Sequence, residues 1–171
     1  MSHVLQHRPA LGQRSPIQHP GIALEALPEG HVLHLLAAPE VDAGALQNAA
    51  CRPLRPVSPG QWFLVGDEVL TPQALADLEA RVKPLADLVD QGHGRVRIAL
   101  SGPRARDVLA KGTAVDLGDP AFPIGHATPT LIGHIGVHLT RTDEDRFELL
   151  VLRGFAQNLW DELALMAAEY A

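Results

Sequence analysis

One short stretch of the sequence has the residue order of a phosphate-binding turn. Residues 98–112, IALSGPRARDVLAKG, predict a strand, a Gly-Pro turn and a short helix with Arg104 and Arg106 in its first turn. The backbone N–H groups at a helix N-terminus can bind phosphate. However, the stretch contains neither G-x-G-x-x-G nor G-x-x-x-x-G-K-[ST], and Pro103 removes one N–H donor. Arginines two positions apart also diverge on a helix, so the stretch favours a packing motif and leaves the arginines open to an anionic or carboxylate partner.

Nine histidines raise the question of a metal site. His31 and His34 are three positions apart on a predicted strand and therefore point to opposite faces. His134 and His138 share a face of another predicted strand, but four residues separate them by roughly 13 Å at about 3.3 Å per residue. The sequence has no H-E-x-x-H pattern and no Cys/His cluster. We therefore predict no metal ligand.

Cys51 and Ser101 are the candidate nucleophiles. Cys51 is the only cysteine, so the chain has no internal disulfide, and an inert thiol is the expected role. Ser101 ends a predicted strand but lies in no G-x-S-x-G elbow, so helix capping is its expected role. Asp87 and Asp90 lie near a predicted helix end and Asp107 lies in a helix, none with an evident partner group. We predict no catalytic and no cofactor-binding residue.

The composition supports a buried core and argues against nucleic-acid binding. Hydrophobic residues make up 46% and aromatic residues 4% of the chain, so the core must consist of Leu, Val, Ile and Ala. The net charge of −6 does not suit a general nucleic-acid partner. Residues 81–111 carry seven Lys/Arg and three Asp, whereas residues 141–171 carry three Arg and seven acids. Such asymmetry suits a partner of complementary charge, although ordinary surfaces also show it.

The N-terminal residues show no apolar run that would suit a signal peptide or a membrane span. We therefore expect a cytoplasmic protein with no membrane partner. Residues 1–21 are rich in Pro, Gln, His and Arg without a period, and we interpret them as an extended arm.

The remaining chain alternates predicted strands and helices. Strands are expected over residues 31–37, 61–66, 94–102, 130–142 and 145–153. Helices are expected over residues 39–50, 103–112 and 154–171, and another begins at Thr71-Pro72 and is stopped or kinked by Pro84. Residues 52–60 and 114–129 read as loops.

Each half of the chain thus has the order strand, helix, loop, strand or strands, helix. We predict an α+β fold of two pseudo-repeated βα(β)βα halves, about 22–90 and 91–171, within a single domain over 22–171 that follows the arm.

Several segments resemble one known family. They include LSGPRARDVL at 100–109, Phe122-Pro123-x-Gly125, Phe147-x-Leu149-x-Val151, and Arg153-x-Phe155-Ala156-x-x-Leu159-Trp160. With SPGQWFLVG at 58–66, they are similar to the gamma subunit of heterotetrameric sarcosine oxidase. The resemblance covers residues 58–170, is weaker over 22–57 and does not extend to the arm.

The resemblance implies a fold similar to the folate-binding domain of aminomethyltransferases. It also implies membership of an αβγδ complex that oxidatively demethylates sarcosine or a related N-methyl amino acid. Such a complex carries FAD, FMN, NAD and zinc and passes one-carbon units to tetrahydrofolate. The gamma chain would bind none of these cofactors and would support chiefly the alpha subunit, beside the beta and delta subunits.

Three functional hypotheses remain open from the sequence: a structural subunit of such a complex, a stand-alone folate-dependent one-carbon transferase, and a small-anion sensor that uses Arg104 or Arg106. For the first hypothesis, we expect the partner interface to include the arm, the loops 52–60 and 114–129, and four basic residues: Arg95, Arg97, Arg104 and Arg106.

Overall fold

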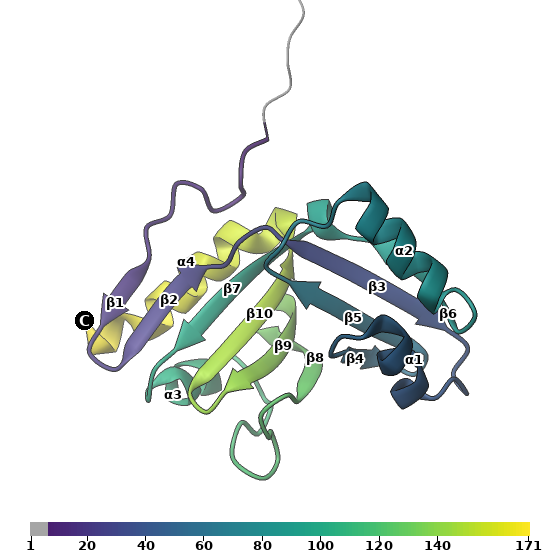
Figure 1. Ribbon diagram of the computed structural model, residues 1–171. Helices are drawn as coiled ribbons and strands as arrows, with labels where there is room; N and C mark the ends of the chain where they lie inside the picture. Colours follow the sequence, from purple (N-terminus) through teal and green to yellow (C-terminus); the bar gives the residue numbers. More distant parts are fainter. Residues whose placement is uncertain (1–6) are drawn as a thin grey trace, which may run out of the picture.

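The computed structural model describes residues 7–171, which form two antiparallel sheets with helices packed on them (Figure 1). The larger sheet has the spatial order β1 (Ile17–His19), β2 (Ile22–Ala26), β7 (Arg95–Ser101), β10 (Arg146–Leu152), β9 (Ile135–Asp143) and β8 (Ala127–Ile132). The smaller sheet has the order β4 (Arg55–Ser58), β5 (Gln61–Gly66), β3 (His31–Ala37) and β6 (Ala86–Asp90). This arrangement confirms the predicted α+β class.

The α-helices formed by residues 7–171 are α1 (Ala43–Ala50), α2 (Pro72–Val82), α3 (Ala105–Ala110) and α4 (Ala156–Ala167). Short 3-10 turns lie at Gly92–Gly94, Arg153–Phe155 and Ala168–Tyr170. Within the same residues, no helix has both the length and the apolar content needed to cross a membrane.

The smaller sheet and two helices form one split β-α-β unit. Its elements follow one another along the chain in the order β3, α1, β4, β5, α2, β6. In the sheet, however, β3 lies in the middle, between β5 and β6. The apolar side chains of α1 and α2 pack with one face of the sheet in a common core, which includes Leu33, Leu35, Leu46, Leu64 and Leu78. The helices therefore cover one face and leave the other face to the larger sheet.

The larger sheet repeats this plan with a strand taken from the beginning of the chain. Its elements follow the order β7, α3, β8, β9, β10, α4, and β2 takes the position that β6 occupies in the smaller sheet. Strand β2 pairs antiparallel with β7, with Ala23 opposite Ser101, and Ile22 and Leu24 join the core of this unit. The predicted half-repeat 22–90 therefore differs from the structure, because β2 completes the second unit.

The structure confirms several elements that the local sequence predicts. Strands β3 and β5 coincide with the predicted ranges 31–37 and 61–66. The Thr71 hydroxyl accepts a hydrogen bond from the Ala74 N–H at 3.2 Å and caps α2, which ends at Val82 before Pro84.

Short strands are where the structure departs from the prediction. The predicted strand 130–142 divides at Gly133, whose φ of +56° places the chain in a tight turn between β8 and β9. Strand β4 arises in a segment predicted as a loop, and β6 arises just after Pro84, where no strand was predicted. Both strands lie at the edges of the smaller sheet. Pro56 is tolerated in β4 because an edge strand has no neighbour on its outer side that needs a backbone N–H.

The stretch 98–112 forms a strand, a turn and a helix, but the helix begins at Ala105 rather than at Pro103. Gly102 has a φ of +112°, and a Cβ there would lie 2.4 Å from the carbonyl oxygen of Gly21. The same carbonyl accepts a hydrogen bond from the Arg104 N–H at 3.0 Å. The turn between β1 and β2 thus lies directly against this turn, and α3 has no side-chain cap from Ser101.

The described part of the arm lies against the larger unit. Leu11 is 4% exposed and joins its core, and residues 17–19 form β1 beside β2. The Arg14 guanidinium pairs with the Asp161 carboxylate on α4 at 2.8 Å. Residues 7–21 are thus attached to the domain, while the first part of the predicted arm falls outside the described residues.

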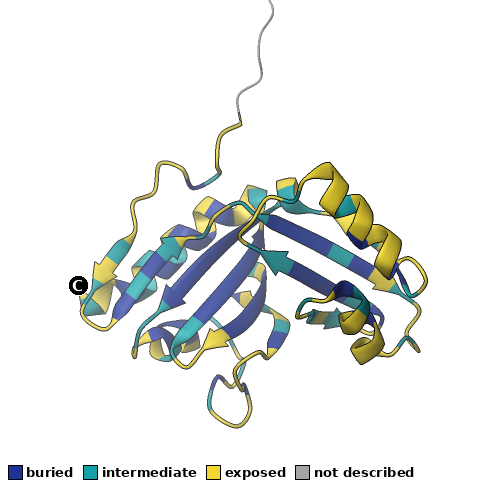
Figure 2. Ribbon diagram, in the orientation of Figure 1, coloured by how far each residue is buried: buried dark blue, intermediate teal, exposed yellow. Residues whose placement is uncertain are grey.

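Buried residues concentrate along the central strands of both sheets, and the outward turns of α2 are exposed (Figure 2). One buried apolar cluster lies under α3 and α4 and a second under α1 and α2. Between the sheets, the buried members of the apolar cluster are only Val32, Phe63 and Leu150 in the part of the chain that the structure describes. Polar contacts must therefore contribute to the junction of the two sheets.

We predict that Leu11→Ala lowers the free energy of unfolding by about 2–3 kcal/mol, because it leaves a cavity in the core of the larger unit. Leu165→Ala, at a position on α4 that is 73% exposed, is the matched control and should change it by less than about 0.5 kcal/mol. Urea denaturation measures both values. Equal values for the two variants would show that the arm is not part of the folded core.

Candidate functional site

A buried carboxylate bound by two arginines joins the two sheets. Glu148 on β10 is 3% exposed and Arg97 on β7 is 6% exposed. The Arg97 Nε donates to Glu148 Oε1 at 2.7 Å and its Nη2 donates to Oε2 at 3.2 Å. Arg55, from β4 of the smaller sheet, donates through Nη2 to Oε2 at 2.9 Å. We call Glu148, Arg97 and Arg55 the ion cluster.

The strand pattern explains why these side chains meet. On β10, Phe147, Leu149 and Val151 point toward the core under α4, so Glu148 and Leu150 point toward the smaller sheet. Arg97 faces the same side, and its Nη1 also donates to Asp67 Oδ1 at 2.7 Å in the loop after β5. The cluster thus joins two strands of the larger sheet to two segments of the smaller unit.

The electrostatics of the ion cluster hold Glu148 ionised. Burial alone raises the pKa of a carboxyl group. Here the hydrogen bonds and positive charges of Arg97 and Arg55 outweigh burial and lower the pKa of Glu148 to about 2. The same contacts raise the pKa of Arg97. A carboxylate with so low a pKa, hydrogen-bonded through both oxygens, is poorly suited to general acid–base catalysis at neutral pH.

Two histidines and a phenylalanine extend this junction. The His138 Nε2–H donates to the Pro56 carbonyl oxygen at 2.8 Å, and the His138 and Phe63 rings lie edge to face at 5.2 Å. The ring of His34 lies 4.8 Å from that of Phe63. Burial lowers the pKa of His138, and the positive charges of Arg55 and Arg95 lower it further. The neutral imidazole is therefore the folded form.

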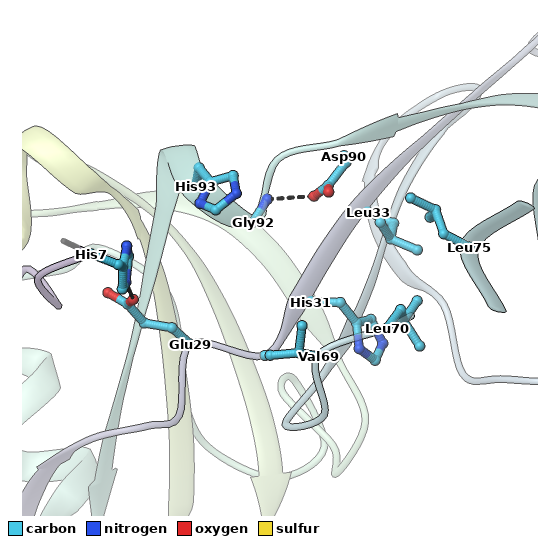
Figure 3. A pocket seen from close by; sticks show the side chains of 11 residues that line it. His7, Glu29, His31, Leu33, Val69, Leu70, Leu75, Asp90, Gly92 and His93 are labelled. Carbon is cyan, nitrogen blue, oxygen red and sulfur yellow. Dashed lines mark hydrogen bonds and ion pairs between the residues drawn. The ribbon is translucent and has the colours of Figure 1, made fainter. Parts of the chain in front are cut away.

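A cavity of about 220 Å³ lies beside the beginning of β3, and Figure 3 shows the side chains that line it. Its rim carries polar groups that already have partners: Glu29 binds Arg153 at 3.1 Å and His7, and Asp90 accepts from the Gly92 N–H at 2.8 Å. Binding sites for organic ligands usually occupy about 300–1,000 Å³. The cavity is small by that measure, and residues 7–171 contain no group of three or more His, Cys, Asp or Glu that could hold a metal ion.

The predicted interface arginines lie in different environments. Arg104 is exposed and pairs with Asp107 at 3.2 Å, whereas Arg106 pairs with Asp119 at 3.1 Å, so the two diverge as expected. Both are already neutralised by carboxylates, which weakens the anion-sensor hypothesis. Arg97 belongs to the buried ion cluster and is not a surface contact.

Arg95 is partly buried and differs from the other three because it has no carboxylate partner within residues 7–171. Its guanidinium carbon lies 4.8 Å from the centre of the Phe63 ring, and its Nε donates to Gln91 Oε1 at 2.8 Å. A half-buried charge of this kind is still open to an external partner.

The other sequence candidates do not form a chemical site. Cys51 is exposed at the end of α1, where its Sγ donates to the Asn48 carbonyl oxygen at 3.2 Å. His134 lies in the turn between β8 and β9, while His138 lies inside, so the two do not share a strand face as predicted. Asp87 and Asp90 lie on β6 rather than near a helix end.

Sequence reasoning missed the ion cluster and a second buried arginine. The available signal was a charged residue within an apolar strand: Glu148 in FELLVL and Arg97 in RVRIAL. Arg141 on β9 is also buried and donates to Asp119 and to the Phe122 carbonyl oxygen at 2.8 Å. It thereby fixes the loop before β8.

We predict that Glu148→Gln lowers the free energy of unfolding by about 3–5 kcal/mol, because the buried Arg97 and the partly buried Arg55 lose the carboxylate that they share. Glu25→Gln removes the carboxylate from a half-exposed pair with Arg146 and should cost about 1 kcal/mol or less. Chemical denaturation at pH 7 compares the two. Similar losses would mean that the ion cluster does not stabilise the junction.

We also predict that mild acid weakens the fold through His138. The pKa of His138 is lower in the folded chain than its ordinary value of 6.5, so the unfolded chain binds more protons below pH 6.5. Stability is therefore complete above about pH 6.5 and falls as the pH drops toward the folded pKa, by at most about 1.4 kcal/mol per pH unit for one group. Denaturation at pH 7.5 and 5.5 measures the slope. His138→Gln should reduce it, and His134→Gln, in an exposed turn, is the matched control; an unchanged slope in His138→Gln would contradict this assignment.

Comparison with known proteins identifies the fold. Heterotetrameric sarcosine oxidase from Corynebacterium sp. U-96, in complex with pyrrole 2-carboxylate, contains a chain that matches with a TM-score of 0.83 and 21% identity over 96% of this chain and 96% of that one. Aminomethyltransferase T of the glycine cleavage system from Bartonella henselae matches with a TM-score of 0.60 and 17% identity over 84% of this chain. This chain spans 45% of that protein.

No curated protein matches the sequence. The two structural similarities confirm the predicted aminomethyltransferase-like fold. The sequence model of the GCVT N-terminal domain matches residues 56–171, which is more than half of the chain. The chain therefore belongs to the GCVT N-terminal domain family.

Proposed function

We propose that this chain is a non-catalytic structural subunit of a sarcosine oxidase-type complex. The observation that carries the proposal is the end-to-end match, over 96% of both chains, to a chain of a heterotetrameric sarcosine oxidase. The complex would oxidatively demethylate sarcosine or a related N-methyl amino acid.

The chemistry of the interior supports a scaffold role. Among residues 7–171, Glu148 is the one buried carboxylate, and both of its oxygens are bound by Arg97 and Arg55. A folate transferase needs a buried acid for the pterin ring and an acid or base for the bound amine. Here the buried charges join the two sheets instead, which suits a subunit whose task is to hold its shape.

We further propose that the partners are the alpha, beta and delta subunits of the same complex, chiefly alpha. FAD, FMN, NAD, zinc and tetrahydrofolate would be bound by those subunits and none by this chain. The complex would be cytoplasmic, with no membrane or nucleic-acid partner. Arg95, Arg104 and Arg106 remain part of the proposed interface.

A stand-alone folate-dependent aminomethyltransferase is the second candidate. The family model and the TM-score of 0.60 to aminomethyltransferase T favour it. The length of the chain argues against this candidate, because the chain covers only 45% of aminomethyltransferase T. The two candidates differ in whether the purified chain binds folate by itself.

We predict that the chain, co-expressed with the other subunits from the same genome, enters a heterotetramer with one copy of each subunit. Native mass spectrometry measures this stoichiometry. Calorimetry of the isolated chain with tetrahydrofolate should show no binding. A stable monomer that does not bind the other subunits would contradict the structural role. Folate binding by the isolated monomer would favour the transferase.

A further inference from the structure

Two exposed leucines flank a glycine at one end of the larger sheet. Leu131 on β8 lies directly opposite Gly136 on β9. Leu152 on β10 lies one position beyond the last recorded pair, Val151 opposite Val137, and therefore beside Gly136 on its other side. Leu131 is 56% exposed and Leu152 is 48% exposed. Since adjacent strands lie about 4.8 Å apart, the two leucines are about 10 Å apart across the glycine.

Gly136 has open space above it between these leucines, and we call this space the hollow. A Cβ at this position would meet no atom within 4 Å, and its backbone lies outside the positive-φ region. The absence of a side chain is thus not required by packing or by the backbone. An apolar side chain of another molecule could fill the hollow and contact both leucines.

The hollow lies on the face of the larger sheet that meets the smaller sheet. Leu152 follows Glu148 and Leu150 in the alternation of β10, and those two are buried at the junction. The exposure of Leu152 and Leu131 shows that the smaller sheet does not extend over this end of the face. The leucines are therefore accessible beside the junction rather than part of it.

Arg95 continues the same row on the next strand, directly opposite Leu152. Two positions along β7, Arg97 has both Glu148 and Asp67, whereas Arg95 has no carboxylate partner within residues 7–171. Burial lowers the pKa of Arg95, and nothing of opposite charge offsets this cost. We call Arg95, Leu152, Gly136 and Leu131 the sheet-end row.

We propose that the sheet-end row binds a segment of the large subunit that places an apolar side chain over Gly136 and a carboxylate against Arg95. This inference rests on the proposed function and names the surface and the chemistry of its partner. An uncompensated arginine beside an apolar hollow selects an acidic and apolar segment over a basic one. Gly136 and Arg95 are two strands apart, about 10 Å, which is about three residues of extended chain or about seven of helix.

Co-expressed subunits carrying single substitutions test the proposal, with affinity measured by native mass spectrometry and by titration of purified subunits. Gly136→Val fills the hollow, and its Cβ enters open space, so the melting temperature of the isolated chain should not fall. Leu131→Asp places a charge in the hollow, and Arg95→Glu reverses the pairing charge. We expect each to weaken binding of the large subunit at least tenfold. Leu165→Asp, at an exposed position on α4, is the matched control and should leave binding unchanged.

The outcomes separate this inference from the proposed function. Failure of the unmodified chain to enter the complex would overturn both. Normal assembly of the unmodified chain together with normal assembly of Gly136→Val and Leu131→Asp would overturn the sheet-end row alone. Should Gly136→Val unfold, Leu131→Asp decides the question, because Leu131 is exposed and contributes little to the isolated fold.

Discussion

The ion cluster of Glu148, Arg97 and Arg55 sets how the two sheets lie on each other. The buried apolar contact between them is small, with Val32, Phe63 and Leu150 as its buried members among residues 7–171. Hydrogen bonds from two arginines to one carboxylate have narrow limits of distance and angle, so they define one arrangement of the sheets where apolar contact alone would allow several. Asp67 and the hydrogen bond from His138 to the Pro56 carbonyl add further fixed points.

Such a junction has a cost that matters for function. Buried charges contribute little net stability compared with apolar packing, and they resist any rearrangement that would separate the partners. The Glu148 carboxylate is therefore committed to holding the sheets and has no oxygen free for a substrate. This commitment agrees with the proposed role as a structural subunit. Arg141 fixes the loop before β8 in a similar way.

The two units are also linked by the path of the chain. Strand β2, near the N-terminus, belongs to the larger sheet, and the next strand along the chain, β3, belongs to the smaller one. The larger sheet therefore cannot be assembled from one contiguous half of the sequence, whereas the smaller sheet lies entirely within residues 31–90. The arm extends this link, because Leu11 packs in the core of the larger unit and β1 adds its edge strand.

The sequence by itself determined the elements whose signals are local. Short apolar runs defined β3 and β5, and Thr71 and Pro72 defined the start of α2. The segments over 58–170 that resemble the sarcosine oxidase gamma subunit indicated the aminomethyltransferase-like fold. Tertiary structure alone decided the partner of β2, the edge strands β4 and β6, the ion cluster and the sheet-end row. Glu148 is 51 residues from Arg97 and 93 from Arg55, and no local pattern encodes which charges will meet across such separations. The alternation of a strand says which residues share a face, but only pairing and register say which residues of other strands lie beside them.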